Sequence, residues 1–256
     1  MRQDERVPFL QALERARVCA YGPGGYVGQE SFMPAADIVE LARRAGVAPG
    51  TSVLDVCCGV AGPGRLIAAE LGCAYLGVDY STSAIAVARA RTRDLPCRFQ
   101  VAHVPPLPAG PFDVVLLLET MLAFRDKVRL LREVAGVLPL GGRFAWTLEE
   151  GDPLTTRERQ AMPDADTVWP VPLGELVRQL RRVGLRISWQ HECSDSHLAV
   201  VDSLIDGFAA DGDRIAAHIG ERALDELVAA HRLWSDWLRS GRVRKFALVA
   251  ERFTAA

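Results

Sequence analysis

Two acidic residues in this chain of 256 residues lie where an apolar segment gives way to a turn, a position that often carries chemistry. Asp55 comes late in the apolar segment 52–56, just before a turn of small residues around Gly59, and Asp79 directly follows the apolar segment 74–78. Small residues leave little side chain between backbone and ligand, and a carboxylate at the neighbouring strand tip can accept both hydroxyls of a ribose. The pattern predicts a site for a cofactor that contains a nucleoside.

The position of Asp55 distinguishes between two such cofactors. A carboxylate at this place suits a cationic ligand and repels a pyrophosphate. The glycine order also departs from the G-x-G-x-x-G fingerprint of dinucleotide sites, whose first glycine would fall on Cys57. Both observations favour S-adenosylmethionine over a dinucleotide.

The same stretch resembles the first motif of the class I S-adenosylmethionine-dependent methyltransferases, a hydrophobic residue followed by Leu-Asp-x-Gly-x-Gly-x-Gly. Leu54, Asp55 and Gly59 match this motif, whereas Cys57 and Ala61 replace its first and last glycines. The resemblance implies that the turn binds S-adenosylmethionine and releases S-adenosylhomocysteine.

The resemblance continues along the chain. Segment 112–116 looks like the family's fourth strand, and segment 130–144 looks like its following helix, glycine turn and fifth strand. In this family Asp79 would bind the ribose and Tyr80 would stack on the adenine. The full set of implied cofactor-binding residues is Asp55, Gly59, Val60, Ala61, Asp79, Tyr80, Ala102, His103, Glu119 and Tyr26.

Apolar segments alternate with helical patterns, which predicts an α/β fold with a Rossmann-like, doubly wound, mostly parallel sheet. The expected strands are 52–56, 74–78, 97–101, 112–118, 143–148, 185–190 and 245–251. The expected helices are 9–18, 34–45, 65–71, 83–92, 126–137 and 173–183. The resemblance implies that the last two strands form a hairpin, which gives a seven-stranded sheet with an antiparallel edge strand.

We expect one domain with a helical cap inserted before the last strand. The cap is indicated by apolar residues at helical spacing over residues 193–241, and it would cover the carboxyl end of the sheet. The expected parts are N-terminal helices and a lid loop in 1–50, the cofactor-binding core in 51–150, a loop, helix and strand in 151–192, the cap, and the last strand in 242–256.

Glu119 ends the apolar segment 114–118 and is the leading candidate for catalysis. A carboxylate at an apolar strand end can have a raised pKa and act as a base, or it can stabilise positive charge on an acceptor. Glu149, at the next strand end, and His197, at the start of the cap, are further candidates for a general base. For all three residues an ordinary salt bridge or hydrogen bond is the alternative interpretation.

Aromatic and polar residues predict an acceptor pocket beneath the cap. Tyr21 and Gln29 flank a glycine-rich loop that resembles the lid of small-molecule methyltransferases, and Trp169 and Trp234 offer aromatic walls. Core packing is the alternative interpretation of the tryptophans. No group of His, Asp and Glu residues shows metal-ligand spacing, so no metal is predicted.

The composition excludes several partners. A net charge of −2 without a basic stripe argues against a nucleic-acid substrate. Six scattered cysteines, a polar start over residues 1–6 and the lack of a long apolar segment predict a cytoplasmic protein without signal peptide or membrane span. The expected partner is a small molecule, and the expected state is a monomer or homodimer.

The leading hypothesis is methyl transfer to an O, N or C atom of a small molecule, by in-line displacement and in secondary metabolism. The capped, aromatic-lined pocket favours it. An NAD(P)-dependent oxidoreductase and a non-catalytic S-adenosylmethionine-binding protein are the alternatives.

Overall fold

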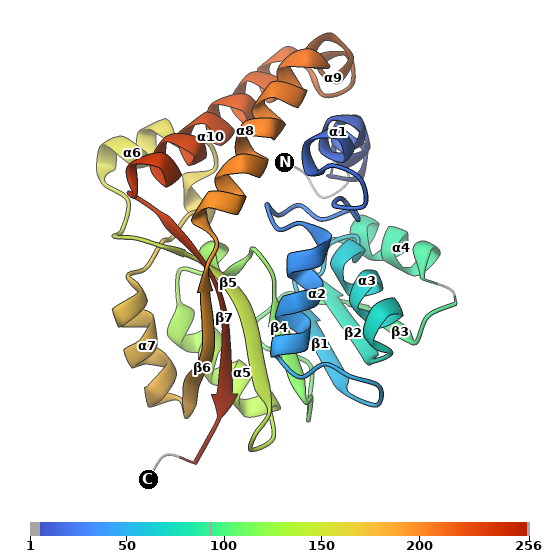
Figure 1. The fold of residues 1–256 in the computed structure, drawn as a ribbon, viewed down its shortest axis with the longest axis vertical. Helices are drawn as coiled ribbons and strands as arrows, with labels where there is room; N and C mark the ends of the chain where they lie inside the picture. The colour runs from blue at the N-terminus through green and yellow to red at the C-terminus, as the bar shows by residue number, and fades with distance from the viewer. Residues whose placement is uncertain (1–5, 93, 255–256) are drawn as a thin grey trace.

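A seven-stranded sheet organises the part of the chain that this computed structural model describes, residues 6–92 and 94–254 (Figure 1). The strands follow the order β3-β2-β1-β4-β5-β7-β6. Their bounds are β1 Ser52–Val56, β2 Ala74–Asp79, β3 Cys97–Val101, β4 Val114–Leu117, β5 Arg143–Glu150, β6 Leu185–Glu192 and β7 Arg244–Arg252. Neighbours from β3 to β5 are parallel, and β7 is antiparallel to both β5 and β6. The predicted sheet is confirmed, with its antiparallel strand one place in from the edge.

Helices connect the strands and extend the chain beyond the sheet. Their bounds are α1 Arg6–Tyr21, α2 Ala35–Arg44, α3 Gly62–Leu71, α4 Thr82–Arg91, α5 Lys127–Val137, α6 Thr156–Ala161, α7 Leu173–Arg182, α8 Ser194–Ala210, α9 Gly212–Ile219 and α10 Glu221–Ser240. Two short 3₁₀ turns, η2 Met121–Ala123 and η3 Ala165–Thr167, complete them.

The two faces of the sheet carry separate apolar cores. Successive residues of a strand point to opposite faces, so Leu54 packs on one side with α5 and α7, whereas Val53 packs on the other with α2, α3 and α4. Both faces are therefore covered, which explains why strands such as β4 are apolar along their whole length.

A helical cap lies beyond the carboxyl ends of the parallel strands. Helices α8, α9 and α10 form it, and α1 packs against them rather than against the sheet (Figure 1). Leu13 and Ala16 of α1 meet Leu204 and Phe208 of α8 in a small core of their own. Gly207 of α8 also faces Ala16, and a Cβ there would lie 3.4 Å from the Cβ of Ala16, an ordinary van der Waals contact. The N-terminal helix α1 therefore packs as a part of the cap, together with α8, α9 and α10.

The polar segment after β5 is more ordered than its composition indicates. The sequence predicts a long loop from Glu149 to Trp169, but this segment contains α6 and η3. Thr155 and Glu158 form a capping box at the start of α6, and Arg242 pairs with Glu158. The Thr-x-x-Glu spacing is a helix-start signal that accounts for the difference.

Two further predictions concern a signal peptide and a membrane span. Residues 1–5, which carry most of the expectation of no signal peptide, lie outside the described residues. Among the described helices, none has both the length and the apolar character needed to cross a bilayer.

Candidate functional site

The turn between β1 and α3 has the left-handed backbone that a glycine motif would provide. Cys57, Gly59 and Ala61 have φ angles of 62°, 55° and 57°. Cys57 and Ala61 occupy positions where the motif has glycine, and a side chain in this region costs about 1–2 kcal/mol. The turn thus keeps the shape of the motif despite its two substitutions, and such strain concentrates at ligand sites.

Gly62 explains how the N-terminal loop reaches this turn. A Cβ on Gly62 would overlap the carbonyl oxygen of Val27 and lie 2.9 Å from the Cα of Gly28. The loop of residues 22–34 therefore lies directly against the start of α3. This contact needs a glycine at position 62, one place after the motif's last glycine.

Asp55 lines a cavity of about 260 Å³ together with Gly59, Val60 and Glu119. Its carboxyl group is 2% exposed and accepts a hydrogen bond from the hydroxyl of Tyr75. Burial raises the pKa of Asp55 to about 7, against the lowering effect of the Tyr75 hydrogen bond. A cationic ligand in this cavity would favour the ionised form, so the site suits an ammonium group.

Asp79 organises the turn from the end of β2. One carboxylate oxygen accepts the N–H of Gly59 at 2.9 Å, and the other accepts the N–H of Ser81 at 2.9 Å. Each carboxylate oxygen can accept about two hydrogen bonds, so this arrangement is compatible with further donors such as ribose hydroxyls.

The next candidates lie side by side at the carboxyl ends of β2 and β3. Tyr80 is 47% exposed, and its ring centroid lies 5.9 Å from that of His103. The N–H of Ala102 donates to the carbonyl of Asp79 at 2.9 Å. The structure thus brings together the four residues that the sequence assigns to the adenosine half of the cofactor.

Three other predicted contacts have different surroundings. Ala61 is fully buried in the core beneath the turn and does not line the cavity. Tyr26 packs its ring 5.6 Å from that of Tyr21 and lines a small hollow with Val60. Gln29 lines the 260 Å³ cavity and not the larger cavity of about 740 Å³ described below.

Gln29 also braces the loop that carries it. Its side-chain amide donates to the carbonyls of Gly25 and Met33 at 2.8 and 2.9 Å, and its Oε1 accepts the N–H of Val27 at 2.6 Å. These bonds occupy the amide with backbone groups. The residue therefore shapes the loop more directly than it can contact a ligand.

The three predicted catalytic residues meet around Lys245, which sequence reasoning missed. Lys245 Nζ lies 2.8 Å from Oε2 of Glu119 and also pairs with Glu149. His197 Nε2 lies 3.3 Å from Oε1 of Glu119. All four side chains are at least nine-tenths buried. The only signal in the sequence was that lysine occurs just twice, at Lys127 and Lys245.

Electrostatics keep Glu119 ionised. Burial raises its pKa, but Lys245 and His197 outweigh this effect and hold the pKa well below its usual range. For Lys245, burial lowers the pKa, but Glu119 and Glu149 outweigh this effect and raise it above its usual range. Glu119 is therefore a weak base and a persistent negative charge.

His197 has no nitrogen left for a substrate. Its Nδ1 lies 3.0 Å from the carbonyl oxygen of Cys193, while Nε2 faces Glu119. Both contacts are hydrogen bonds only if both ring nitrogens carry protons. With both ring nitrogens facing protein oxygens, His197 positions the carboxylate of Glu119 rather than contacting a ligand.

The backbone at Glu119 is also unusual. Its φ is 57°, and its N–H donates to Oγ1 of the buried Thr147 at 2.6 Å. Its Oε2 accepts the N–H of Phe32, at 3.4 Å, which ties the N-terminal loop to the cluster. Together with His197 and Lys245, these contacts hold Glu119 from four different parts of the chain.

Glu150 lies outside the cluster, although it is adjacent to Glu149 in the sequence. Its carboxylate accepts from Arg244 Nε at 3.0 Å near the surface. Consecutive residues of a strand point to opposite faces, so only one of the two acids can join the cluster. Oε2 of Glu149 is buried without a hydrogen-bond partner among the described residues.

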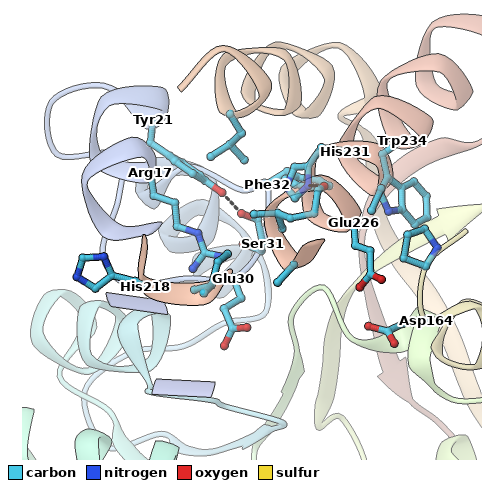
Figure 2. Close-up of a pocket in the computed structure, with 16 residues that line it drawn as sticks. Arg17, Tyr21, Glu30, Ser31, Phe32, Asp164, His218, Glu226, His231 and Trp234 are labelled. Carbon is cyan, nitrogen blue, oxygen red and sulfur yellow. Dashed lines mark hydrogen bonds between the residues drawn. The ribbon is translucent and has the colours of Figure 1, made fainter. Parts of the chain in front are cut away.

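A larger cavity of about 740 Å³ lies between α1, the N-terminal loop and the cap (Figure 2). Tyr21, Phe32 and Trp234 line it, as do His218 and His231. The two cavities share Glu30 and Ser31 on their walls. They are thus neighbours, with the N-terminal loop between them.

Of the residues expected in the acceptor pocket, Tyr21 and Trp234 line this cavity, whereas Trp169 does not. The guanidinium carbons of Arg125 and Arg159 lie 4.9 and 3.9 Å from the ring centroid of Trp169, which lines a separate hollow. Its Nε1 donates to the carbonyl of Asp166 at 2.7 Å. Trp169 therefore lies outside the 740 Å³ cavity, and its neighbours there include Arg159 of α6, a helix that the sequence did not predict.

Within the described residues, no group of three or more His, Cys, Asp and Glu side chains is arranged to hold a metal ion.

Comparison with known proteins identifies the core. Residues 54–146 match the family model described as a methyltransferase domain. Methyltransferase GfsG of Streptomyces halstedii is 37% identical over 112 residues, which cover 41% of this chain and 40% of that protein. The chain therefore matches well under half the length of this relative.

Solved structures share the fold over nearly the whole chain. The cyclopropane synthase MmaA2 of Mycobacterium tuberculosis has a TM-score of 0.83 at 14% identity, covering 98% of this chain and 96% of that one. Phosphoethanolamine N-methyltransferase 2 of Haemonchus contortus, in complex with S-adenosyl-L-methionine, has a TM-score of 0.77 at 19% identity, covering 96% of this chain and 60% of that one. At these identities the likeness concerns the fold.

Proposed function

Residues 54–146 form a class I S-adenosylmethionine-dependent methyltransferase domain, and from this premise we propose that the chain transfers a methyl group from S-adenosylmethionine to an O, N or C atom of a small molecule. The observation that carries the proposal is the position of Glu119. It lines the 260 Å³ cavity beside the turn, and it accepts the N–H of Phe32, which lines the 740 Å³ cavity.

The residues around the smaller cavity fit the cofactor. Asp79 accepts the ribose hydroxyls in addition to the N–H groups it already holds, and Asp55 faces the ammonium of the amino-acid tail. Tyr80 and His103 flank the adenine. When bound, S-adenosylmethionine supplies an electrophilic methyl group on a sulfonium.

Glu119 stabilises positive charge at the junction of the two cavities. Because Lys245 and His197 keep it ionised, we assign it electrostatic stabilisation rather than proton abstraction. Lys245, Glu149 and His197 position its carboxylate. The loop of residues 22–34 closes over the turn and excludes water.

The acceptor is small and enclosed. A cavity of about 740 Å³ lies within the usual range for small-molecule pockets, and its aromatic lining suits a partly apolar molecule. A role in secondary metabolism and a cytoplasmic location, which the sequence leads us to expect, remain part of this proposal.

Calorimetric titration of the full chain with S-adenosylhomocysteine and with NADH tests the proposal. We expect S-adenosylhomocysteine to bind and NADH not to bind. Binding of NADH alone would favour an oxidoreductase, and binding of neither ligand would remove both functions. If S-adenosylmethionine binds but no methyl group reaches any acceptor in a broad small-molecule panel, the chain is a binding protein.

A further inference from the structure

One buried positive charge at the larger cavity has no use in the mechanism above. Arg17 of α1 is 9% exposed, and its Nη1 is buried without a hydrogen-bond partner among the described residues. Within the same part of the chain, the guanidinium donates no other hydrogen bond and joins no ion pair. By contrast, the buried Lys245 is paired with two carboxylates.

A charge in this situation is costly. A buried ion without a partner costs several kcal/mol, and proteins usually pair such groups or leave them uncharged. Arginine cannot become uncharged, because its guanidinium stays protonated at all accessible pH values. A ligand with an acceptor for this guanidinium would remove much of that free-energy cost, and the difference would contribute to its affinity.

The position of Arg17 shows where such a ligand would lie. Its side chain lines the 740 Å³ cavity together with Tyr21, whose hydroxyl donates to the carbonyl of Ser31 (Figure 2). Arg17 thus extends from α1 to the N-terminal loop. That loop also borders the cofactor cavity and donates the N–H of Phe32 to Glu119, so it connects the two cavities.

Three acidic side chains line the cavity, and one of them, Glu30, lies on the same side as Arg17 in Figure 2. Glu226 and Asp164 lie on the opposite side of the cavity in Figure 2, and Glu226 pairs with Arg222 at 2.9 Å. His231, on the cavity wall, is held uncharged: burial, and to a lesser degree the charge of Arg17, lower its pKa to about 4, against the raising effect of its bond to the Leu227 carbonyl. Arg17 Nη1 is thus a buried donor at the α1 end of the cavity without a hydrogen-bond partner among the described residues, although Glu30 lies on the same side.

We propose that the acceptor carries an anionic group, a carboxylate or a phosphate, that Arg17 binds at the α1 end of the large cavity. This inference rests on the proposed function and narrows its substrate class. The planar guanidinium suits both groups, since each offers two oxygens to its parallel N–H donors. Tyr21, Phe32 and Trp234 would then contact the apolar body of the same molecule.

Calorimetry with four probes, in the presence of saturating S-adenosylhomocysteine, tests this inference. Benzoate and phenyl phosphate carry the two anionic groups, benzamide is the neutral counterpart and benzylamine the cationic one. At least one anionic probe should bind about tenfold or more tightly than benzamide, as expected for a hydrogen-bonded ion pair. The preference between benzoate and phenyl phosphate tells which anion the site accepts.

Variants separate Arg17 from general electrostatics. Arg17→Gln should reduce the affinity for the preferred anion about tenfold or more, with Arg17→Lys retaining part of it. Arg15→Gln, on the exposed side of the same helix, should leave it unchanged. Equal binding of anionic and neutral probes, preference for benzylamine, or no binding of any probe at millimolar concentration would overturn the inference. If the unmodified chain does not bind S-adenosylhomocysteine, the proposed function itself is refuted.

Discussion

Lys245 Nζ lies 2.8 Å from Oε2 of Glu119, and this contact joins the start of β7 to the end of β4. Lys245 also pairs with Glu149, so one ammonium holds two of the three acids and bases that the sequence nominates for catalysis. Because β7 directly follows the last helix of the cap, this contact connects the end of the cap to the edge of the cofactor cavity.

The first prediction concerns the stability of this cluster. Lys245→Met should lower the free energy of unfolding by about 3–5 kcal/mol, because it leaves two buried carboxylates without their cation. Urea unfolding measures the change. Arg244→Met, at the adjacent and half-exposed residue paired with Glu150, should cost less than about 1 kcal/mol. A similar small cost for Lys245→Met would show that the cluster is not the buried network described above.

The second prediction isolates the charge of Glu119. Glu119→Gln should weaken binding of S-adenosylmethionine about tenfold while leaving S-adenosylhomocysteine nearly unchanged, since only the former carries a sulfonium charge. Calorimetry with both ligands gives the ratio directly. Glu150→Gln is the matched control, because its side chain points away from the cavity and pairs with Arg244. Equal losses for the two ligands would argue against electrostatic stabilisation by Glu119.

The third prediction follows from the raised pKa of Asp55. Burial raises it from 3.8 to about 7, so between these values the folded protein binds more protons at this site than the unfolded chain does. Stability contributed by this group is therefore lost as pH rises through that window, by a few kcal/mol at most. Unfolding free energies of the parent chain and of Asp55→Asn, compared across the window, check this. The variant should gain on the parent as pH rises, and parallel curves would contradict the assignment.

The fourth prediction concerns the close contact of Gly62 with the N-terminal loop. Gly62→Ala should destabilise the protein by about 1–3 kcal/mol and weaken S-adenosylhomocysteine binding, because the loop must move away from the turn. Gly136→Ala is the control: it lies inside α5, has open space around its Cα and should stabilise by about 0.5–1 kcal/mol. Unaltered binding by a folded Gly62→Ala variant would mean that the loop does not help to form the cofactor cavity.

The parts of the fold that the sequence predicts well are those with local signals. The strands and the helices that cover them follow from apolar periodicity, and the turn at Cys57 and Ala61 keeps its left-handed form because the surrounding strand and helix impose it. Asp79 is predictable for the same reason, since the end of β2 fixes its place beside the turn.

The site beyond the turn depends on contacts that local patterns do not reveal. Lys245 and Glu119 meet only because β7 inserts beside β5, and Arg17 reaches the cavity only because α1 packs on the cap. Trp169 lies outside the larger cavity because it packs on Arg125, from the segment before α5, and on Arg159 of α6, whose start the capping box fixes. Long-range packing decides such positions.

The affinity for S-adenosylhomocysteine of the parent chain and of Asp79→Asn tests the central claim most directly. The substitution removes the charged acceptor for the ribose hydroxyls, so affinity should fall about a hundredfold or more. The control is Asp113→Asn. The carboxylate of Asp113 accepts hydrogen bonds from Ser52 at the amino ends of β1 and β4, away from the turn, so this variant should bind like the parent. A folded Asp79→Asn variant with the parent's affinity would contradict a cofactor site built on Asp79 and the turn at Gly59.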